Sequence, residues 1–202
     1  LRPDDRVAVM AFDRDTDLSA DFRSDRYAVA STIRDVVLKR PPVSFTRLQG
    51  AVLDAARHFL GQPRTNRRRA VLVVTDNMGS TRDEGAMQDL WEADAVLSAV
   101  VVPGVTAMRR QRRLFPATWF GFGTIDGIVR RTGGDTLKAD DPADDFRQMV
   151  QRLRVRYTLH YAMPVGKPGK TRKIEVKLTP EASRRYAGST VYARSGYVVP
   201  DK

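Results

Sequence analysis

A short apolar run in the first half of the chain constrains the fold more than any other feature. Five apolar residues, Ala70 to Val74, follow an Arg and are closed by Thr75 and Asp76. An apolar run of this length between polar residues is typical of a strand buried on both faces of a sheet. In open α/β sheets, ligands bind at the carboxyl ends of such strands. The run therefore predicts a buried strand with a carboxylate, Asp76, at the ligand-binding edge.

Strand and helix patterns alternate through residue 155. Apolar residues spaced by three and four predict the helices, and short apolar or alternating runs predict the strands. Strands are predicted at 6–12, 17–22, 70–75 and 95–102, and helices at 25–38, 46–60, 83–94, 124–132 and 141–154. Such alternation predicts an α/β fold with an open, doubly wound, mostly parallel sheet and helices on both faces.

The last fifty residues have a different pattern. Three segments alternate apolar and polar residues, at 157–161, 172–178 and 191–199. They predict three antiparallel strands, with an exposed turn at 167–170 and a looser connection at 180–188. About forty residues in three strands bury too little apolar surface to fold alone. We therefore expect an α/β domain over 1–155 and a β extension over 156–202 that packs on it.

The charge balance restricts the class of partner. The chain of 202 residues has a formal net charge of +11, much of it from two Arg clusters at 64–69 and 109–113. Such a charge favours acidic partners. Neither cluster is interleaved with aromatic residues, and no helix-turn-helix or zinc-finger spacing occurs, which argues against nucleic-acid binding. No apolar run approaches the roughly 20 residues that span a membrane.

Several motifs resemble those of a known family. Leu1–Val9 and Val73–Asp76 resemble the second and fourth strands of von Willebrand factor A domains. Segments 153–161, 172–176 and 193–197 resemble the ending of a subgroup of von Willebrand factor A-related proteins from acidobacteria. The resemblance covers nearly the whole chain. It implies a bacterial, Rossmann-like adhesion or protein-binding module, exported or in the cell envelope.

The resemblance also implies a metal-ion-dependent adhesion site. In this family Mg²⁺ is held by hydroxyls and carboxylates at the carboxyl edge of the sheet, and a carboxylate of the protein ligand completes the shell. Thr46 and Asp76 match the family's Thr and distal Asp, but the family's Asp-x-Ser-x-Ser loop has no counterpart here. Two ligands make a weak site, so this chain would bind Mg²⁺ weakly or not at all. Alternatively, Thr46 caps its helix and Asp76 caps the following turn.

The Asp-x-Ser-x-Ser loop belongs to the family's first strand, which this sequence also lacks. The resemblance implies that this strand would lie centrally, between the strands at 6–12 and 70–75. Without it, two buried strands lack a common hydrogen-bonding neighbour. We therefore expect the chain to be part of a longer protein; the alternative is that another segment or subunit fills the gap.

These observations together lead to two hypotheses for the function. The first is a non-enzymatic module that binds an acidic protein ligand of unknown identity at the edge carrying Thr46 and Asp76. Four arginines in the loop after strand 95–102 would steer this ligand: Arg109, Arg110, Arg112 and Arg113. The second is a metal-free structural or assembly domain of a larger exported protein. With two separated histidines and no Cys, nucleophilic catalysis has no support.

Overall fold

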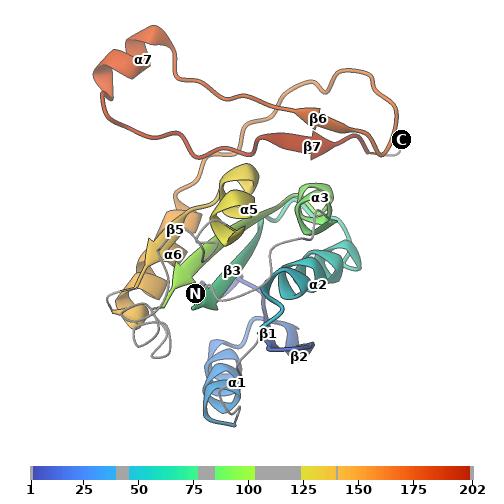
Figure 1. Cartoon of the computed structure of the whole chain (residues 1–202), viewed down its shortest axis with the longest axis vertical. Helices are drawn as coiled ribbons and strands as arrows, with labels where there is room; N and C mark the ends of the chain where they lie inside the picture. Colours follow the sequence, from blue (N-terminus) through green and yellow to red (C-terminus); the bar gives the residue numbers. More distant parts are fainter. Residues whose placement is uncertain (1, 40–45, 77–84, 103–123, 140, 201–202) are drawn as a thin grey trace, which may run out of the picture.

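The molecule has three parts that follow one another along its long axis. The computed structural model describes residues 2–39, 46–76, 85–102, 124–139 and 141–200. A small β-hairpin with one helix lies at one end, a helix-covered sheet lies in the middle, and a second hairpin with a helix lies at the other end (Figure 1). The middle part contains the main hydrophobic core.

The middle part is a parallel sheet of three strands. They are β3 (Arg69–Thr75), β4 (Ala95–Val101) and β5 (Thr136–Lys138), in the order β3-β4-β5. The five-residue apolar run lies in β3, as predicted, and Arg69 pairs with Ala95 at the start of the β3–β4 ladder. Only β5 has no counterpart among the predicted strands, because three residues are too short for a periodic pattern.

Helices cover both faces of this sheet. They are α2 (Leu48–Leu60), α3 (Gly85–Glu92), α5 (Thr124–Thr132) and α6 (Pro142–Arg154). Side chains alternate between the faces of a strand. Accordingly Val73 and Leu97 pack in one apolar cluster with residues of α2, α3 and α5, whereas Val100 packs with Met149 of α6 in another. This part is the mixed α/β fold expected from the alternating pattern.

The first two strands form a separate sheet. β1 (Val7–Phe12) and β2 (Thr16–Arg23) pair antiparallel, and α1 (Arg26–Lys39) follows them. Among the described residues, β1 pairs with β2 alone and β3 with β4 alone. The described residues therefore show the predicted α/β fold, but not clearly the predicted doubly wound sheet. In the described part of the chain, no strand lies between β1 and β3 to receive hydrogen bonds from both, in line with the first strand that the resemblance implies to be missing.

Burial along β3 reflects the same open edge. β4, between two neighbours, is buried at five of its seven residues, whereas β3 is buried at only two and Val74 is 47% exposed. The N-terminal part is held to the middle part near the start of β1, where Arg67 donates to the carbonyl of Asp4 and Arg154 pairs with Asp5, and near the end of β1, where the N–H of Arg47 donates to the carbonyl of Asp13. An apolar strand next to an unpaired edge stays partly exposed because a neighbouring strand is what removes it from water.

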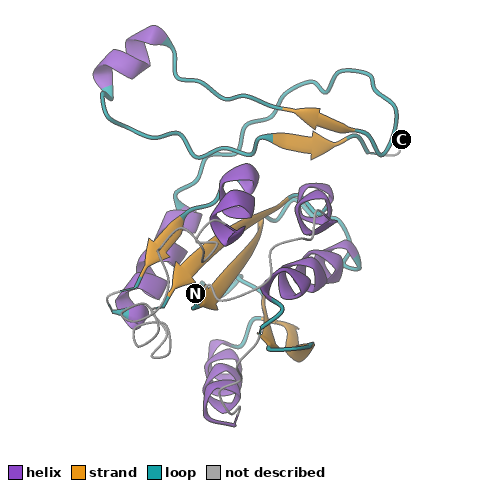
Figure 2. Cartoon of the chain, viewed as in Figure 1, coloured by secondary structure: helices purple, strands orange, loops and turns teal. Residues whose placement is uncertain are grey.

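The C-terminal part differs from the expected three-stranded extension. Two short strands, β6 (Thr171–Lys173) and β7 (Gly196–Val198), pair antiparallel, and α7 (Pro180–Arg185) lies between them. The strand expected at 157–161 is not formed, since these residues are extended but have no paired neighbour. The looser connection expected at 180–188 contains α7, whose N-cap Thr179 accepts from the N–H of Ala182. Long loops join these elements (Figure 2).

The C-terminal part contacts the middle part through its last strand. The N–H of Ser195 donates to the carbonyl of Arg131, and the Arg194 guanidinium pairs with Asp94. Tyr197 and Val199 are buried. The turn at 167–170 is exposed, as expected. The division into a domain of residues 1–155 and an extension of residues 156–202 stays a prediction.

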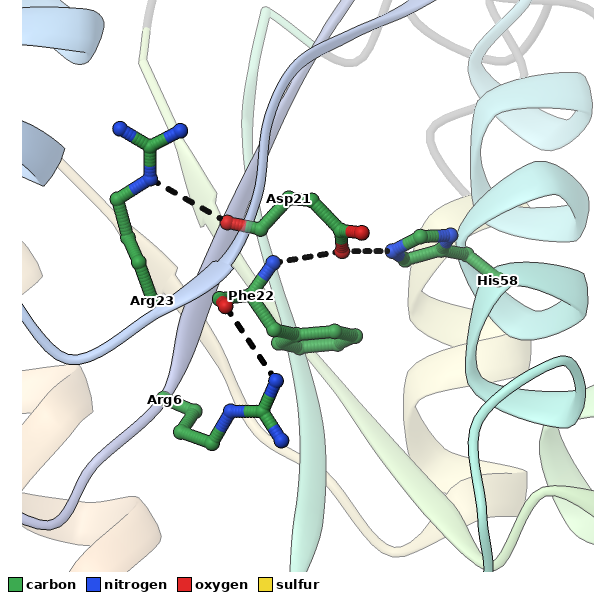
Figure 3. Close-up of polar contacts among 5 residues, drawn as sticks. All are labelled: Arg6, Asp21, Phe22, Arg23 and His58. Carbon is green, nitrogen blue, oxygen red and sulfur yellow. Dashed lines mark hydrogen bonds and ion pairs between the residues drawn. The ribbon is translucent and has the colours of Figure 1, made fainter.

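A polar contact joins β2 to α2 (Figure 3). One carboxylate oxygen of Asp21 accepts from the N–H of Phe22 (2.6 Å) and lies 2.9 Å from Nε2 of His58. The rings of Phe22 and His58 stack at 5.1 Å. The Phe22 N–H, and after it the His58 side chain, hold the pKa of Asp21 below its ordinary value of 3.8. The contact therefore favours the ionised form of Asp21.

This lowered pKa gives a pH prediction. A carboxylate whose pKa is lower in the folded state stabilises the protein above its unfolded pKa, and this contribution disappears as pH falls through the folded pKa. The difference in unfolding free energy between the wild type and Asp21→Asn should therefore be constant above pH 3.8 and shrink below it. Urea unfolding of both chains from about pH 6 to about pH 2.5 measures it. A difference that stays the same over this range would contradict the prediction.

Candidate ligand-binding edge

The end of β1, the start of α2 and the end of β3 meet at one edge of the molecule. The N–H of Arg47 donates to the carbonyl of Asp13, which directly follows β1 (2.7 Å). Phe12, Leu48 and Val73, one from each element, belong to one apolar cluster. We call the four residues that flank the ends of these elements the ligand edge. They are Asp13, Thr46, Arg47 and Asp76.

The two predicted metal ligands both lie on this edge. Thr46 is half-buried and immediately precedes the N-cap of α2, and Asp76 is exposed and directly follows β3. The alternative places Thr46 at the N-cap of α2, whereas in the structure Arg47 occupies that position and its own side chain makes no cap hydrogen bond. The alternative that Asp76 caps the next turn concerns residues 77–84, which lie outside the described residues.

The donor set of the ligand edge does not by itself fit Mg²⁺. This ion prefers near-octahedral oxygen coordination and usually retains several waters. Asp13, Thr46 and Asp76 supply three candidate oxygen ligands, fewer than an octahedral set, and the described part of the chain contains no group of three or more His, Cys, Asp and Glu that could hold a metal ion. In addition, Arg47 places a positive charge beside Thr46 in the chain. We therefore derive the chemistry of this edge without a metal ion.

Arg47 is a feature that sequence reasoning missed. Its side chain is exposed and folds over the first turn of α2, so that a Cβ added at Gly50 would lie 3.3 Å from Nη2 of Arg47. The first turn of α2 contains no acidic residue, and the side chain of its N-cap residue Arg47 makes no cap hydrogen bond. A helix N-terminus carries unpaired N–H groups and a partial positive charge. The start of α2 is therefore a positively charged point on this edge. The sequence feature that could have indicated it is an Arg at the start of a predicted helix.

The steering arginines and the two histidines are not among the residues that define the ligand edge. Arg109, Arg110, Arg112 and Arg113, expected to steer the ligand, fall outside the described residues. His58 lies at the contact between α2 and β2, and His160 is exposed in the C-terminal part. The two histidines thus lie on different parts of the molecule and do not form a joint site.

Comparison with known proteins supports the fold alone. Neither a family model nor a curated protein matches the chain. Among solved structures, it is similar to an aerotolerance-related membrane protein from Bacteroides fragilis with multiple mutations to serine (15% identity, TM-score 0.54). It is also similar to the conserved hypothetical protein BatB from Bacteroides thetaiotaomicron (18% identity, TM-score 0.53). Each match covers 76% of this chain and 81% of the other. The described helices include none long and apolar enough to cross a membrane.

Proposed function

We propose that this chain is a non-enzymatic protein-binding module of the von Willebrand A type, and that an acidic protein ligand binds at the ligand edge. The observation that carries the proposal is the exposed Arg47 at the N-cap of α2, beside the carboxyl end of β1. A carboxylate of the ligand would accept hydrogen bonds from the Arg47 guanidinium, and the positive end of the α2 dipole would favour its negative charge. The match to two solved structures, each with a TM-score above 0.5, supports the fold on which this edge depends.

An NMR titration with an acidic peptide tests the proposal. The probe is a flexible synthetic peptide of Gly and Ser with one central Asp. It should shift the amide signals of residues 47–51, and Arg47→Glu should weaken its binding at least about fivefold, because each charged hydrogen bond contributes about 1.5–3 kcal/mol. Arg64→Glu is the matched control, since Arg64 is exposed in the loop before β3 and carries the same charge. Equal weakening by both variants, or shifts away from α2, would contradict the proposal.

The second candidate function is a metal-free structural or assembly domain within a larger exported protein. It is favoured by the shortage of metal ligands among the described residues. Calorimetric titration with MgCl₂ and with MnCl₂ separates it from a metal-dependent adhesion module. Binding at one ion per chain that disappears in Thr46→Ala and in Asp76→Ala would exclude the metal-free version. Absence of a binding heat with either ion would support it.

A further inference from the structure

The segment that leaves α6 exposes an alternating apolar row. Every second residue from 155 to 165 is apolar, and each is exposed to solvent by 45% or more, with Tyr157 at 94% and Val165 at 89%. The row consists of Val155, Tyr157, Leu159, Tyr161, Met163 and Val165. Scattered exposed apolar residues are normal on a protein surface, whereas a continuous row marks an interaction site.

The backbone of this segment is extended and lacks a neighbouring strand. Pro164 has no N–H group, and the N–H groups of residues 156–163, 165 and 166 donate no hydrogen bond within the described part of the chain. A row of unpaired N–H groups on an extended segment can receive a further strand. The open backbone and the alternating side chains are thus the two features that strand addition requires.

Contacts at both ends hold the segment in place. Arg68 donates to the carbonyls of Arg154 and Arg156 at its start. Near its other end, Arg172 donates to the carbonyl of Val165, and the Tyr161 ring lies edge-on to Tyr197 of β7, with centroids 6.2 Å apart. A segment already held extended loses less conformational freedom when a partner binds.

The charge around the row indicates what kind of partner fits. Residues 155–200 contain nine Lys and Arg and two Glu, so that this part has a net charge of +7 out of +11 for the whole chain. Lys167, Lys170 and Lys173 are exposed. A second copy of the chain would bring the same positive charge against this surface and be repelled, whereas an acidic partner would be attracted.

We propose that residues 155–165 form a second binding surface, which takes up an extended segment of an acidic partner protein as an added β-strand. The partner segment alternates apolar residues, which cover Tyr157 and Leu159, with Glu or Asp. Backbone hydrogen bonds supply the pairing, and the neighbouring lysines supply the preference for acidic residues. This surface is separate from the ligand edge.

Fluorescence anisotropy with a labelled peptide tests this surface. The probe is an eleven-residue peptide that alternates Val with Glu, compared with one in which Lys replaces Glu and one in which the Glu residues are grouped together. The full chain should bind the first peptide at least about tenfold more tightly than the other two. Peptide binding should also slow hydrogen exchange of the amides of residues 155–165.

Paired variants separate the contributions. Tyr157→Ser with Leu159→Ser should weaken peptide binding about tenfold, because it removes two apolar contacts. The matched control is Val37→Ser with Leu38→Ser on α1, where both residues are exposed by more than 70%, and it should leave binding within about twofold. Lys170→Glu with Lys173→Glu should also weaken binding, and Arg47→Glu should not, which distinguishes this surface from the ligand edge.

Several outcomes would overturn the proposal. Equal binding of the Val–Glu and Val–Lys peptides, or unchanged binding by the Tyr157 and Leu159 double variant, would exclude the acidic strand. Self-association in analytical ultracentrifugation that disappears in the same double variant would identify a second copy as the occupant. Binding to phosphatidylglycerol vesicles without binding to the peptide would identify an anionic membrane surface instead.

Discussion

Replacing Gly134 by Ala is expected to destabilise the protein by about 3 kcal/mol or more, at the upper end of the range for overpacked cores. Gly134 lies between α5 and β5, where its N–H donates to the carbonyl of Val129. A Cβ added here would overlap the carbonyl oxygen of Leu97 and lie 2.7 Å from its carbonyl carbon. The obstacle is backbone of a buried strand and cannot rotate away as a side chain would. The turn after α5 would therefore have to move off β4.

The same substitution at Gly127 is the matched control. Gly127 lies on the exposed face of α5, and a Cβ added there would meet nothing within 4 Å. Ala is a better helix former than Gly by about 1 kcal/mol, so Gly127→Ala should raise stability slightly. Urea unfolding of the two variants and the wild type measures both effects. If Gly134→Ala changed the unfolding free energy by less than 1 kcal/mol, the close approach of this turn to β4 would be wrong.

Other contacts at this turn explain why it is packed so closely. The N–H of Leu97 donates to the hydroxyl of Thr132, which is buried at the end of α5. The N–H of Ala99 donates to the carbonyl of Asp135. Both bonds satisfy backbone groups of β4 before its pairing with β5 begins at Thr136. The Gly133-Gly134 pair that follows α5 thus also sets the distance between this helix and the central strand.

The predictable parts of the fold are those with long periodic patterns. β3 and β4 were predicted because an apolar run bounded by polar residues has few other solutions in a soluble domain. α6 begins where its acidic start indicates, with Asp141 accepting from the N–H groups of Ala143 and Asp144. Short elements were missed. β5 has three residues and α7 has six, which are too few for a periodic pattern of apolar residues to be recognised in the sequence.

Pairing is harder to predict than backbone extension. The alternation at 157–161 indicated a strand, and the segment is indeed extended, but alternation carries no information about whether a neighbour is available. The same limit applies to the ligand edge. The motif around Thr46 indicated that α2 begins there, yet whether Thr46 or Arg47 takes the cap depends on where the end of β1 lies, which is a tertiary contact.

The second large effect is expected at Trp91, which joins the C-terminal part to the middle part. Trp91 lies on α3 and is 7% exposed, and its Nε1–H donates to the carbonyl of Arg131 (3.0 Å). That carbonyl also accepts from the N–H of Ser195. A Cβ added at Gly196 of β7 would lie 2.7 Å from Cη2 of Trp91, so the ring packs directly against the strand. The indole ring is therefore the surface against which β7 packs.

Trp91→Ala should lower the unfolding free energy by about 3–5 kcal/mol, as is usual for a buried Trp. It should also speed hydrogen exchange at residues 193–199 more than elsewhere, because β7 loses the indole ring against which it packs. Trp91→Phe keeps an aromatic ring and should cost less, and Tyr157→Ala, at a side chain 94% exposed, should stay within about 0.5 kcal/mol. If Trp91→Ala lowered stability while residues 193–199 kept their relative protection, the ion pair of Arg194 with Asp94 would be the contact that holds the C-terminal part.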